Sequence, residues 1–251
     1  MPSASPAPKL SIIIPCYNEE KRLPSTFEEI LRYMEGFPYT WELLICDDGS
    51  KDATVAYGKE MRARYGEHIR VIEAPGNMGK GAATRRGMLA ARGKYRLFTD
   101  ADNSTPIEEV EKLLLALKKR RAHVAIGSRA LKQSQLEVRQ PWHREMMGRT
   151  FNAVVQNIAT PGIRDTQCGF KLFTAEATEQ LFGHQQLNGF SFDVEILYLA
   201  RRFRYRTVEV PIRWINNEES KVSPVKDSLR VFRDVLTIRW MHRKTTPFPK
   251  P

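Results

Sequence analysis

Two aspartates two residues apart give this sequence its clearest chemical signal. Asp100 and Asp102 follow the apolar run at residues 97–99. In extended backbone, side chains two positions apart point the same way, so both carboxylates can face one object. Hard cations such as Mg²⁺ usually bind one or two carboxylates together with substrate phosphates. The spacing therefore favours a divalent cation holding a diphosphate, with a turn or helix N-cap as the alternative.

Three other polar segments suit a nucleotide. Asp47 or Asp48 can accept hydrogen bonds from a base or a ribose hydroxyl, and Tyr17 can lie against a base. Lys80 lies between two glycines at a predicted helix start, where free backbone N–H groups and an ammonium favour an anion. This segment is not a P-loop, because no Ser or Thr follows the lysine. No G-x-G-x-x-G follows the first predicted strand, which argues against a dinucleotide fold.

Short β-branched runs that alternate with helical patterns would position these residues. We predict strands over residues 10–14, 41–46, 69–72, 95–99 and 124–126, with helices between them. Ser25 with Glu28, and Thr105 with Glu108 around Pro106, fit capping boxes at helix starts. The alternation predicts an α/β fold with a mostly parallel sheet and helices on both faces. Ligands bind such sheets beyond the carboxyl ends of the strands, where all four polar segments lie.

Composition limits the class of protein. A chain of 251 residues with 41% hydrophobic content can bury a full core. No run of about 18 apolar residues is present, and residues 1–8 lack the features of a secretory signal. Cys16, Cys46 and Cys168 lie far apart without metal-ligand spacing, which suits a reducing compartment. We therefore expect a cytoplasmic protein.

The net charge of +11 is concentrated near the carboxyl end, where residues 201–251 hold thirteen Lys or Arg and five Asp or Glu. Such a surface attracts nucleic acid, anionic lipid or a phosphorylated substrate. A nucleic-acid-binding protein would leave the aspartate pair without a function, so we do not favour it. A solvated basic tail is the other alternative.

Two amphipathic helices are predicted in this half of the chain, at residues 141–158 and 225–241. The second would place Leu229, Phe232 and Leu236 on one face and Lys226, Arg230 and Arg233 on another. Basic amphipathic helices lie in bilayer interfaces, although such apolar stripes more often pack against a core. Peripheral binding to the cytoplasmic membrane face is thus one of two alternatives.

The motifs resemble those of the inverting family 2 glycosyltransferases with the GT-A fold. The matching segments are Ile-Pro-Cys-Tyr-Asn-Glu at 14–19, Asp-Asp-Gly-Ser at 47–50, Asn-Met-Gly-Lys-Gly at 77–81 and Asp-Ala-Asp at 100–102. Gly-Ser-Arg at 127–129 and the segment 165–173 resemble the dolichyl-phosphate β-glucosyltransferase branch. The resemblance implies a single Rossmann-like GT-A domain at 9–243, with a nucleotide-sugar half (9–127), an acceptor half (128–243) and disordered tails at 1–8 and 244–251.

The activity implied by this resemblance is transfer of glucose from UDP-glucose to a dolichyl or polyprenyl phosphate, with inversion and with Mg²⁺ or Mn²⁺. GDP-mannose as donor is one alternative. A family 2 enzyme that acts on the hydroxyl of a soluble acceptor is another. No residue distinguishes uracil from guanine by itself.

The resemblance also assigns site residues. Those implied for the nucleotide sugar are Pro15, Tyr17, Asn18, Glu19, Asp47, Asp48, Lys80, Asp100 and Asp102. Asp100 and Asp102 would also hold the metal, and Ser104 stands where related mannosyl synthases have a third, glutamine ligand. Arg129, Arg144 and Lys221 would meet the acceptor phosphate.

A phosphate acceptor changes what the enzyme must supply. A phosphate monoester, with a second pKa of about 6, is already anionic at neutral pH and needs cations more than a general base. Asp165 is the first candidate for orienting the acceptor or acting as a catalytic base, and Asp193 is the second. A turn or cap at Asp165, and a helix cap at Asp193, are the structural alternatives.

Overall fold

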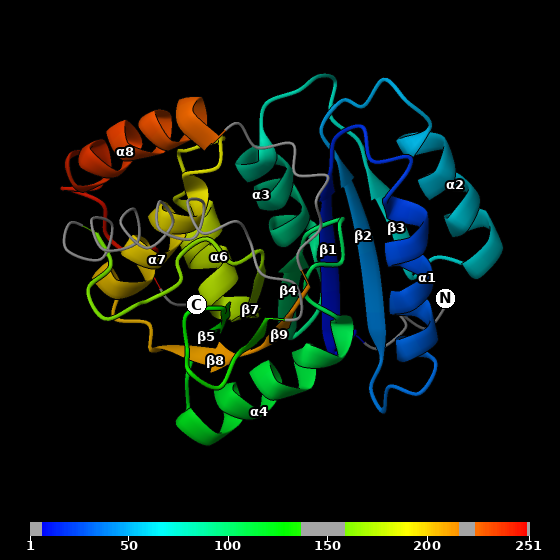
Figure 1. Cartoon of the computed structure of the whole chain (residues 1–251), viewed down its shortest axis with the longest axis horizontal. Coiled ribbons are helices and arrows are strands. Elements are labelled where there is room, and N and C mark those ends of the chain that lie inside the picture. Colours follow the sequence, from blue (N-terminus) through cyan, green and yellow to red (C-terminus); the bar gives the residue numbers. More distant parts are fainter. Residues whose placement is uncertain (1–6, 137–158, 216–223, 250–251) are drawn as a thin grey trace.

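A computed structural model describes residues 7–136, 159–215 and 224–249, and a seven-stranded sheet forms its centre (Figure 1). The strands are β1 (Leu10–Cys16), β2 (Trp41–Asp47), β3 (Ile69–Ile72), β4 (Tyr95–Thr99), β5 (Val124–Ser128), β7 (Phe170–Thr174) and β8 (Thr207–Pro211). Their order is β3-β2-β1-β4-β7-β5-β8. Only β7 runs antiparallel to its neighbours in this sheet, so the predicted mostly parallel sheet is confirmed.

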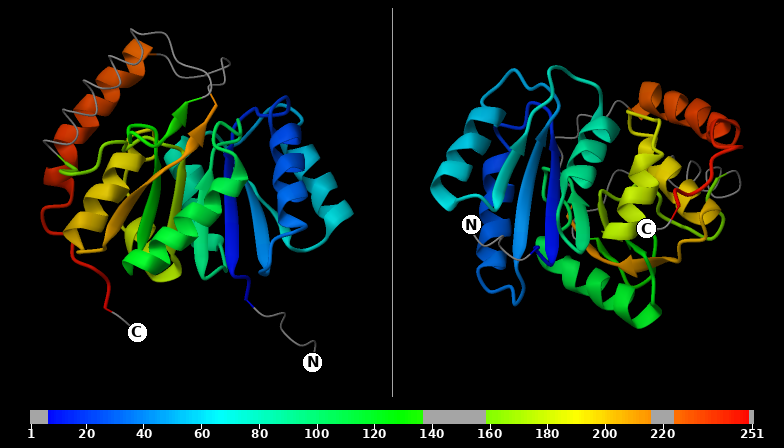
Figure 2. Two further views of the ribbon diagram at one scale, coloured as in Figure 1. Left: turned by 60° about the horizontal axis from the view of Figure 1, so that its bottom comes forward. Right: turned by 180° about the vertical axis from the view of Figure 1, so that it is seen from behind.

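Helices cover both faces of the sheet, as Figure 2 shows from two sides. One face carries α1 (Leu23–Met34), α2 (Thr54–Tyr65) and α4 (Val110–Arg120), and the other carries α3 (Lys80–Ala90), α6 (Ala175–Gly183) and α7 (Phe192–Arg202). Side chains of a strand alternate between the faces. In β1, Ile12 and Ile14 therefore join the first core, whereas Ile13 joins the second. This double burial explains why the strands read as continuous apolar runs.

Smaller elements complete the fold. The 3₁₀ helix η1 (Ile107–Glu109) precedes α4, and β6 (Gln135–Leu136) pairs in parallel with β9 (Arg213–Trp214). The long helix α8 (Pro224–Met241) lies outside α7, at one edge of the molecule (Figure 1). No helix in the described ranges has both the length and the apolar character needed to cross a membrane.

The five predicted strands are confirmed, but both predicted capping boxes are wrong. Helix α1 begins at Leu23, so Ser25 lies inside its first turn and donates a hydrogen bond to Arg22 O (3.0 Å). Pro24, whose fixed φ suits a first turn, accounts for the earlier start. Thr105 does not cap a helix either, because the 3₁₀ turn begins at Ile107 without a side-chain cap.

The faces of α8 also differ from the prediction. Val235 and Ile238 are buried against Val194 of α7. Leu236 is exposed and lies on the same side as Arg233, three positions away, instead of on an opposite apolar face. The side chains at 224–232 and the predicted helix at 141–158 lie outside the described residues.

A buried contact between a histidine and a glutamate joins α8 to the rest of the molecule. His242 Nε2 lies 2.7 Å from Glu195 Oε1 of α7, and both side chains are fully buried. The same carboxylate accepts the backbone N–H groups of Gln186 and Leu187, each at 2.8 Å. Farther along, Phe248 stacks on His184 of the segment after α6, in a region for which the sequence predicted a disordered tail.

We expect Glu195→Ala to lower the free energy of unfolding by about 3–5 kcal/mol, because a buried histidine and two backbone N–H groups lose their acceptor. Glu67→Ala is the matched control, since Glu67 forms an exposed pair with Arg62 and such pairs contribute at most about 1 kcal/mol. Urea unfolding at pH 7 measures both. Equal losses in the two variants would contradict a structural function for the buried pair.

Candidate active site

The loops that follow β1, β2, β3 and β4 meet at one edge of the sheet. Asn18, which has a positive φ of 54°, joins the first two loops: its N–H donates to Ser50 Oγ and its Oδ1 accepts from Lys51 N, both at 2.8 Å. Thr26 Oγ1 donates to Ala101 O (2.8 Å), which connects α1 to the loop after β4. The structure therefore brings together the four polar segments that the sequence singled out.

Asp47 and Asp48 hold these loops in place. Asp47 accepts the N–H groups of Gly49 and Ser50 and so forms a tight turn. Asp48 accepts the N–H groups of Met78 (3.0 Å) and Gly79 (2.6 Å). Both carboxylates are buried. Tyr17 is partly exposed on the same edge, and Pro15 is buried within β1.

The glycines around Lys80 permit close packing at the start of α3. A Cβ at position 81 would lie 2.8 Å from Leu187 O, and Gly79, with φ of 109°, lies against the carbonyl of Asn188. Ala82 N donates to that same carbonyl (3.2 Å). The segment 187–188 therefore fixes the backbone that carries Lys80.

Lys80 and the aspartate pair form the charged centre of the site. The Lys80 ammonium lies 2.6 Å from Asp100 Oδ1. Burial lowers the pKa of Lys80, but the nearby carboxylates, led by Asp100, outweigh it and raise that pKa above its ordinary value. Asp102 Oδ1 accepts Ser104 N (3.0 Å). Burial, and then the charge of Asp100, raise the pKa of Asp102.

The aspartate pair fits a hard divalent cation. Asp102 lies in surroundings that disfavour its negative charge, and a cation would relieve this. The described part of the chain contains no cluster of three or more His, Cys, Asp or Glu side chains arranged to hold a metal. Two carboxylates leave the other coordination positions to water and substrate oxygens, as Mg²⁺ prefers. Gly169 belongs to this centre, because a Cβ there would overlap the Asp100 carboxylate.

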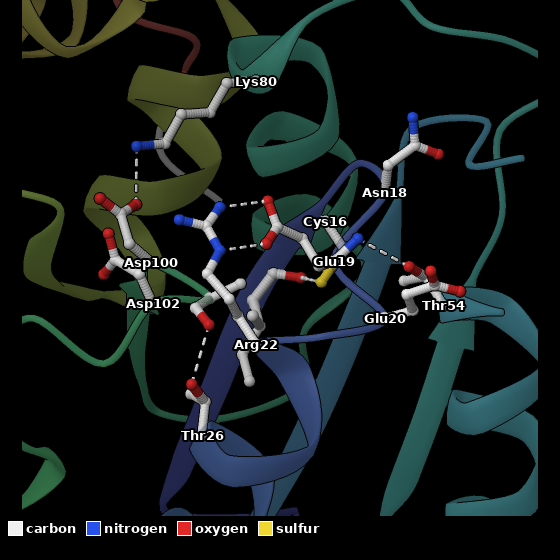
Figure 3. A network of polar contacts seen from close by, with 12 residues as sticks. Cys16, Asn18, Glu19, Glu20, Arg22, Thr26, Thr54, Lys80, Asp100 and Asp102 are labelled. Carbon is white, nitrogen blue, oxygen red and sulfur yellow. Dashed lines mark hydrogen bonds and ion pairs between the residues drawn. The ribbon is translucent and has the colours of Figure 1, made fainter. Parts of the chain in front are cut away.

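Arg22 is a residue of this centre that the sequence did not reveal. Its Nε and Nη2 donate to the two oxygens of Glu19 at 2.7 and 2.6 Å. Figure 3 shows its guanidinium between Glu19 and the aspartate pair. An Arg three residues after a Glu is a common surface pairing, so its position in the sequence gave no signal of burial.

A buried ion pair lies close enough to Lys80 for one of its members, Asp193, to act on the charge of that lysine. The ammonium of Lys171 in β7 forms an ion pair with Asp193 in the first turn of α7 and donates to Cys168 O (2.5 Å). Burial raises the pKa of Asp193, and the charges of Lys171 and Lys80 only partly offset this. The sequence predicted Asp193 but not Lys171, whose partner lies 22 residues away.

Arg129 and Asp165 form the third charged group. Asp165 accepts three hydrogen bonds from Arg129, from N (2.9 Å), Nε (2.8 Å) and Nη2 (2.9 Å). The guanidinium carbon also lies 5.5 Å from the Trp214 ring. Asp165 is buried, which alone would raise its pKa, but Arg129 holds that pKa below its ordinary value.

Two further residues with structural functions were missed. Arg86 Nη2 pairs with Asp48 Oδ1 (2.8 Å), and Glu209 accepts the backbone N–H of Asp165 (3.0 Å). Both contacts join distant parts of the chain, so no local pattern predicts them. Arg144 and Lys221, predicted to meet the acceptor phosphate, lie outside the described residues.

Comparisons with known proteins agree on one family. A family model described as glycosyl transferase family 2 matches residues 11–182. The dolichyl-phosphate β-glucosyltransferase of Drosophila melanogaster is 41% identical over 93% of this chain and 75% of its own length. The Homo sapiens protein of the same name is 38% identical over 94% and 76%, respectively.

Solved structures share the fold. Glucosyl-3-phosphoglycerate synthase from Mycobacterium tuberculosis, in complex with Mn²⁺, UDP and glucosyl-3-phosphoglycerate, aligns with a TM-score of 0.68. Its sequence is 19% identical, and the alignment covers 95% of this chain and 81% of that one. The complex of the same enzyme with Mn²⁺, UDP-glucose and phosphoglyceric acid gives 0.66.

The ion pair of Arg129 and Asp165 predicts a pH-dependent stability. The pKa of Asp165 in the folded protein lies below the unfolded value of about 3.9. The stabilisation is therefore complete above that value and is lost as the pH falls through the folded-state pKa. We expect Asp165→Asn to lower the free energy of unfolding at pH 7 by about 3 kcal/mol.

Urea titrations of wild type and Asp165→Asn at several pH values measure this difference. It should shrink as the pH falls below about 4. Asp52→Asn provides a control in which a less buried carboxylate, hydrogen-bonded to Thr54, is removed. A difference for Asp165→Asn that stays constant down to the lowest pH would contradict the ion-pair interpretation.

Proposed function

This chain belongs to glycosyl transferase family 2, and we propose that it transfers glucose from UDP-glucose to a dolichyl or polyprenyl phosphate with inversion at the anomeric carbon. The products are UDP and the polyprenyl-phosphate β-glucose. The observation that carries this proposal is the aspartate pair next to Lys80 at the carboxyl end of β4, in a chain 41% identical to a dolichyl-phosphate β-glucosyltransferase.

We assign the two steps of recognition to two parts of the chain. Residues 9–127 form the nucleotide-sugar half, in which Tyr17, Glu19 and Asp48 lie at the nucleoside end. Asp100 and Asp102 would hold Mg²⁺ or Mn²⁺ at the diphosphate end. The cation would supply positive charge that stabilises the departing UDP. Residues 128–243 form the acceptor half.

Charge accounts for the acceptor chemistry. An oxygen of the acceptor phosphate forms the new bond to the anomeric carbon, while the bond from that carbon to UDP breaks and its electron pair stays on the β-phosphate oxygen. The acceptor carries no proton that must be removed at neutral pH. We assign Arg129 to hold the acceptor phosphate, because a guanidinium can donate two parallel hydrogen bonds to the oxygens of a phosphate.

The two predicted catalytic carboxylates fit this chemistry as positioning groups. Asp165 accepts three hydrogen bonds from Arg129, so we propose that it orients the acceptor through that arginine. Asp193, paired with Lys171, lies close enough to Lys80 to act on its charge. We propose that Asp193 helps to keep Lys80 charged next to the donor.

Transfer of radiolabelled sugar into an organic-extractable product tests the proposal. UDP-glucose and GDP-mannose are compared, with polyprenyl-phosphate liposomes and Mg²⁺ or Mn²⁺. Label should enter lipid from UDP-glucose alone. Label from GDP-mannose alone would identify GDP-mannose as the donor instead. Metal-dependent hydrolysis of UDP-glucose without lipid labelling would indicate that the acceptor is a soluble molecule.

In the same assay, Asp102→Ala should reduce turnover by at least about 100-fold, because charge on the departing diphosphate would lose its main stabilisation. Its thermal melting curve should remain cooperative. Glu60→Ala, which removes an exposed carboxylate of α2, should leave turnover unchanged. Near-normal turnover in Asp102→Ala would contradict the proposal that Asp100 and Asp102 hold the metal.

We also propose peripheral contact with the cytoplasmic membrane face through the outer side of α8. Trp240 and Leu236 are 66% and 52% exposed there, and Arg243 lies with its guanidinium carbon 4.8 Å from the Trp240 ring. Arg233 and Arg239 are exposed nearby. Tryptophan favours the headgroup region, and arginines attract the anionic lipids of the cytoplasmic leaflet.

Replacing both Leu236 and Trp240 with Ala should reduce binding to vesicles containing phosphatidylserine several-fold in cosedimentation. Leu115→Ala on α4 is the matched control, because Leu115 is also 50% exposed and lies near exposed lysines. Activity towards a detergent-dispersed acceptor should persist in the double variant. Equal binding by wild type and double variant would exclude this side of α8 as the contact.

A further inference from the structure

Lys171 of β7 carries its charge in the interior of the protein. Its side chain is 0% exposed, and that of its partner Asp193 is 6% exposed. Removing an ammonium from water is costly unless it is paired and hydrogen-bonded. Besides Asp193, the Lys171 ammonium contacts Cys168 O (2.5 Å) and lies 5.2 Å from the centre of the Phe98 ring. It therefore joins α7, β4 and the segment directly before β7.

The segment that Lys171 holds lies against a proposed metal ligand. The carbonyl of Gly169, the residue after Cys168, accepts the backbone N–H of Asp100 (3.2 Å). A Cβ at position 169 would overlap the Asp100 carboxylate, so this carboxylate lies directly on the backbone of Gly169. Only two residues, Cys168 and Gly169, therefore separate the buried ammonium from the Asp100 carboxylate.

The pairing of β4 with β7 places these groups on one side of the sheet. Phe98 and Lys171 lie opposite each other in the antiparallel ladder, and opposite residues share a face. Asp100 lies two positions after Phe98, and Gly169 two positions before Lys171, so alternation returns both to that face. Helix α7, which supplies Asp193, covers the same face. The fold therefore brings Lys171 and its counterion next to the metal-binding end of β4.

Stability alone does not explain a lysine at this position. Replacing a buried ion pair with apolar side chains of similar volume is often neutral or stabilising. A methionine at position 171 would fill the same space, but it has no N–H group to donate to Cys168 O. The hydrogen bond to this carbonyl, next to Asp100, is therefore what the lysine adds to the core.

We propose that Lys171 is a positioning residue for the metal site: its ammonium fixes the backbone of Cys168 and Gly169, and this backbone sets the direction of the Asp100 carboxylate. The inference rests on the proposed function, because it takes Asp100 as a metal ligand. Lys171 is fully buried, so it acts through this backbone and not through contact with the donor. Removal of a group that orients a metal ligand typically weakens metal binding about 10–100-fold.

The Mn²⁺ requirement of UDP binding tests this inference. Calorimetry measures the affinity of the full chain for UDP at several Mn²⁺ concentrations, and the requirement is the concentration that gives half of the maximal gain in affinity. For Lys171→Met we expect this concentration to rise about tenfold or more. Affinity for uridine should stay within about twofold of wild type, because Asp48 and the loops that it holds are unchanged.

Lys112→Met is the matched control. Lys112 of α4 also pairs with a carboxylate that is 6% exposed, that of Glu109, but it lies on the helix layer of the other face of the sheet. The same substitution there should leave the Mn²⁺ requirement unchanged. A rise as large in Lys112→Met as in Lys171→Met would overturn the inference.

A purely structural function of Lys171 predicts a different result. Urea unfolding would then show a lower stability for Lys171→Met, while the folded variant would keep the Mn²⁺ requirement of wild type, and this result would overturn the inference. Where Lys171→Met does not fold, the double variant Lys171→Met with Asp193→Leu removes both charges and carries the test. Its Mn²⁺ requirement should still be raised, because Cys168 O has no donor, and a wild-type requirement there would also overturn the inference.

Two other effects are separated by the same titrations. Loss of the Asp193 charge next to Lys80 would appear as weaker UDP binding at saturating Mn²⁺, not as a raised Mn²⁺ requirement. Wild-type protein that binds UDP equally well without Mn²⁺ would contradict the proposed metal site, and the inference with it. Metal-dependent UDP binding by wild type, with an unchanged requirement in Lys171→Met, would overturn the inference about Lys171 alone.

Discussion

Repulsion between Asp100 and Asp102 is the constraint on which the rest of this site depends. Burial raises the pKa of Asp102, and the charge of Asp100 raises it further. The protein surrounds them with fixed cations from separate elements. Lys80 comes from α3 and Arg22 from the start of α1. Neutrality is thus nearly reached without metal, and the remaining negative charge favours a divalent ion.

The sequence predicted the strands and the meeting of their loops better than it predicted the contacts between side chains. Strand positions followed from β-branched runs bounded by polar segments, and the meeting of their loops followed from parallel pairing, which the register of β1 with β2 and β4 confirms. The helix starts were wrong because the capping pattern at Ser25 competed with a proline one residue earlier. A local motif does not show which of two nearby starts the packing will select.

The unpredicted parts of the site are pairings across long sequence distances. Asp165 stood out in the sequence, but its partner Arg129 is 36 residues away and comes from another strand end. Lys171 lies in the segment 165–173 that carries the family resemblance but was assigned no function, yet it is fully buried and pairs with Asp193. Burial of a charge is decided by the complete fold, so a single sequence identifies the acid and leaves its counterion open.

The carboxylate of Glu195 connects two parts of the molecule that are far apart in the sequence. It holds His242, just beyond α8, and the backbone of the segment 186–187 at the same time. Leu187 and Asn188 of the same segment pack against Gly79 and Gly81, the glycines on either side of Lys80. Glu195 therefore connects the outermost helix to the backbone that carries Lys80. Under the proposed membrane contact of α8, a displacement of that helix would reach the backbone of Lys80 through Glu195, so membrane binding and donor binding would be coupled.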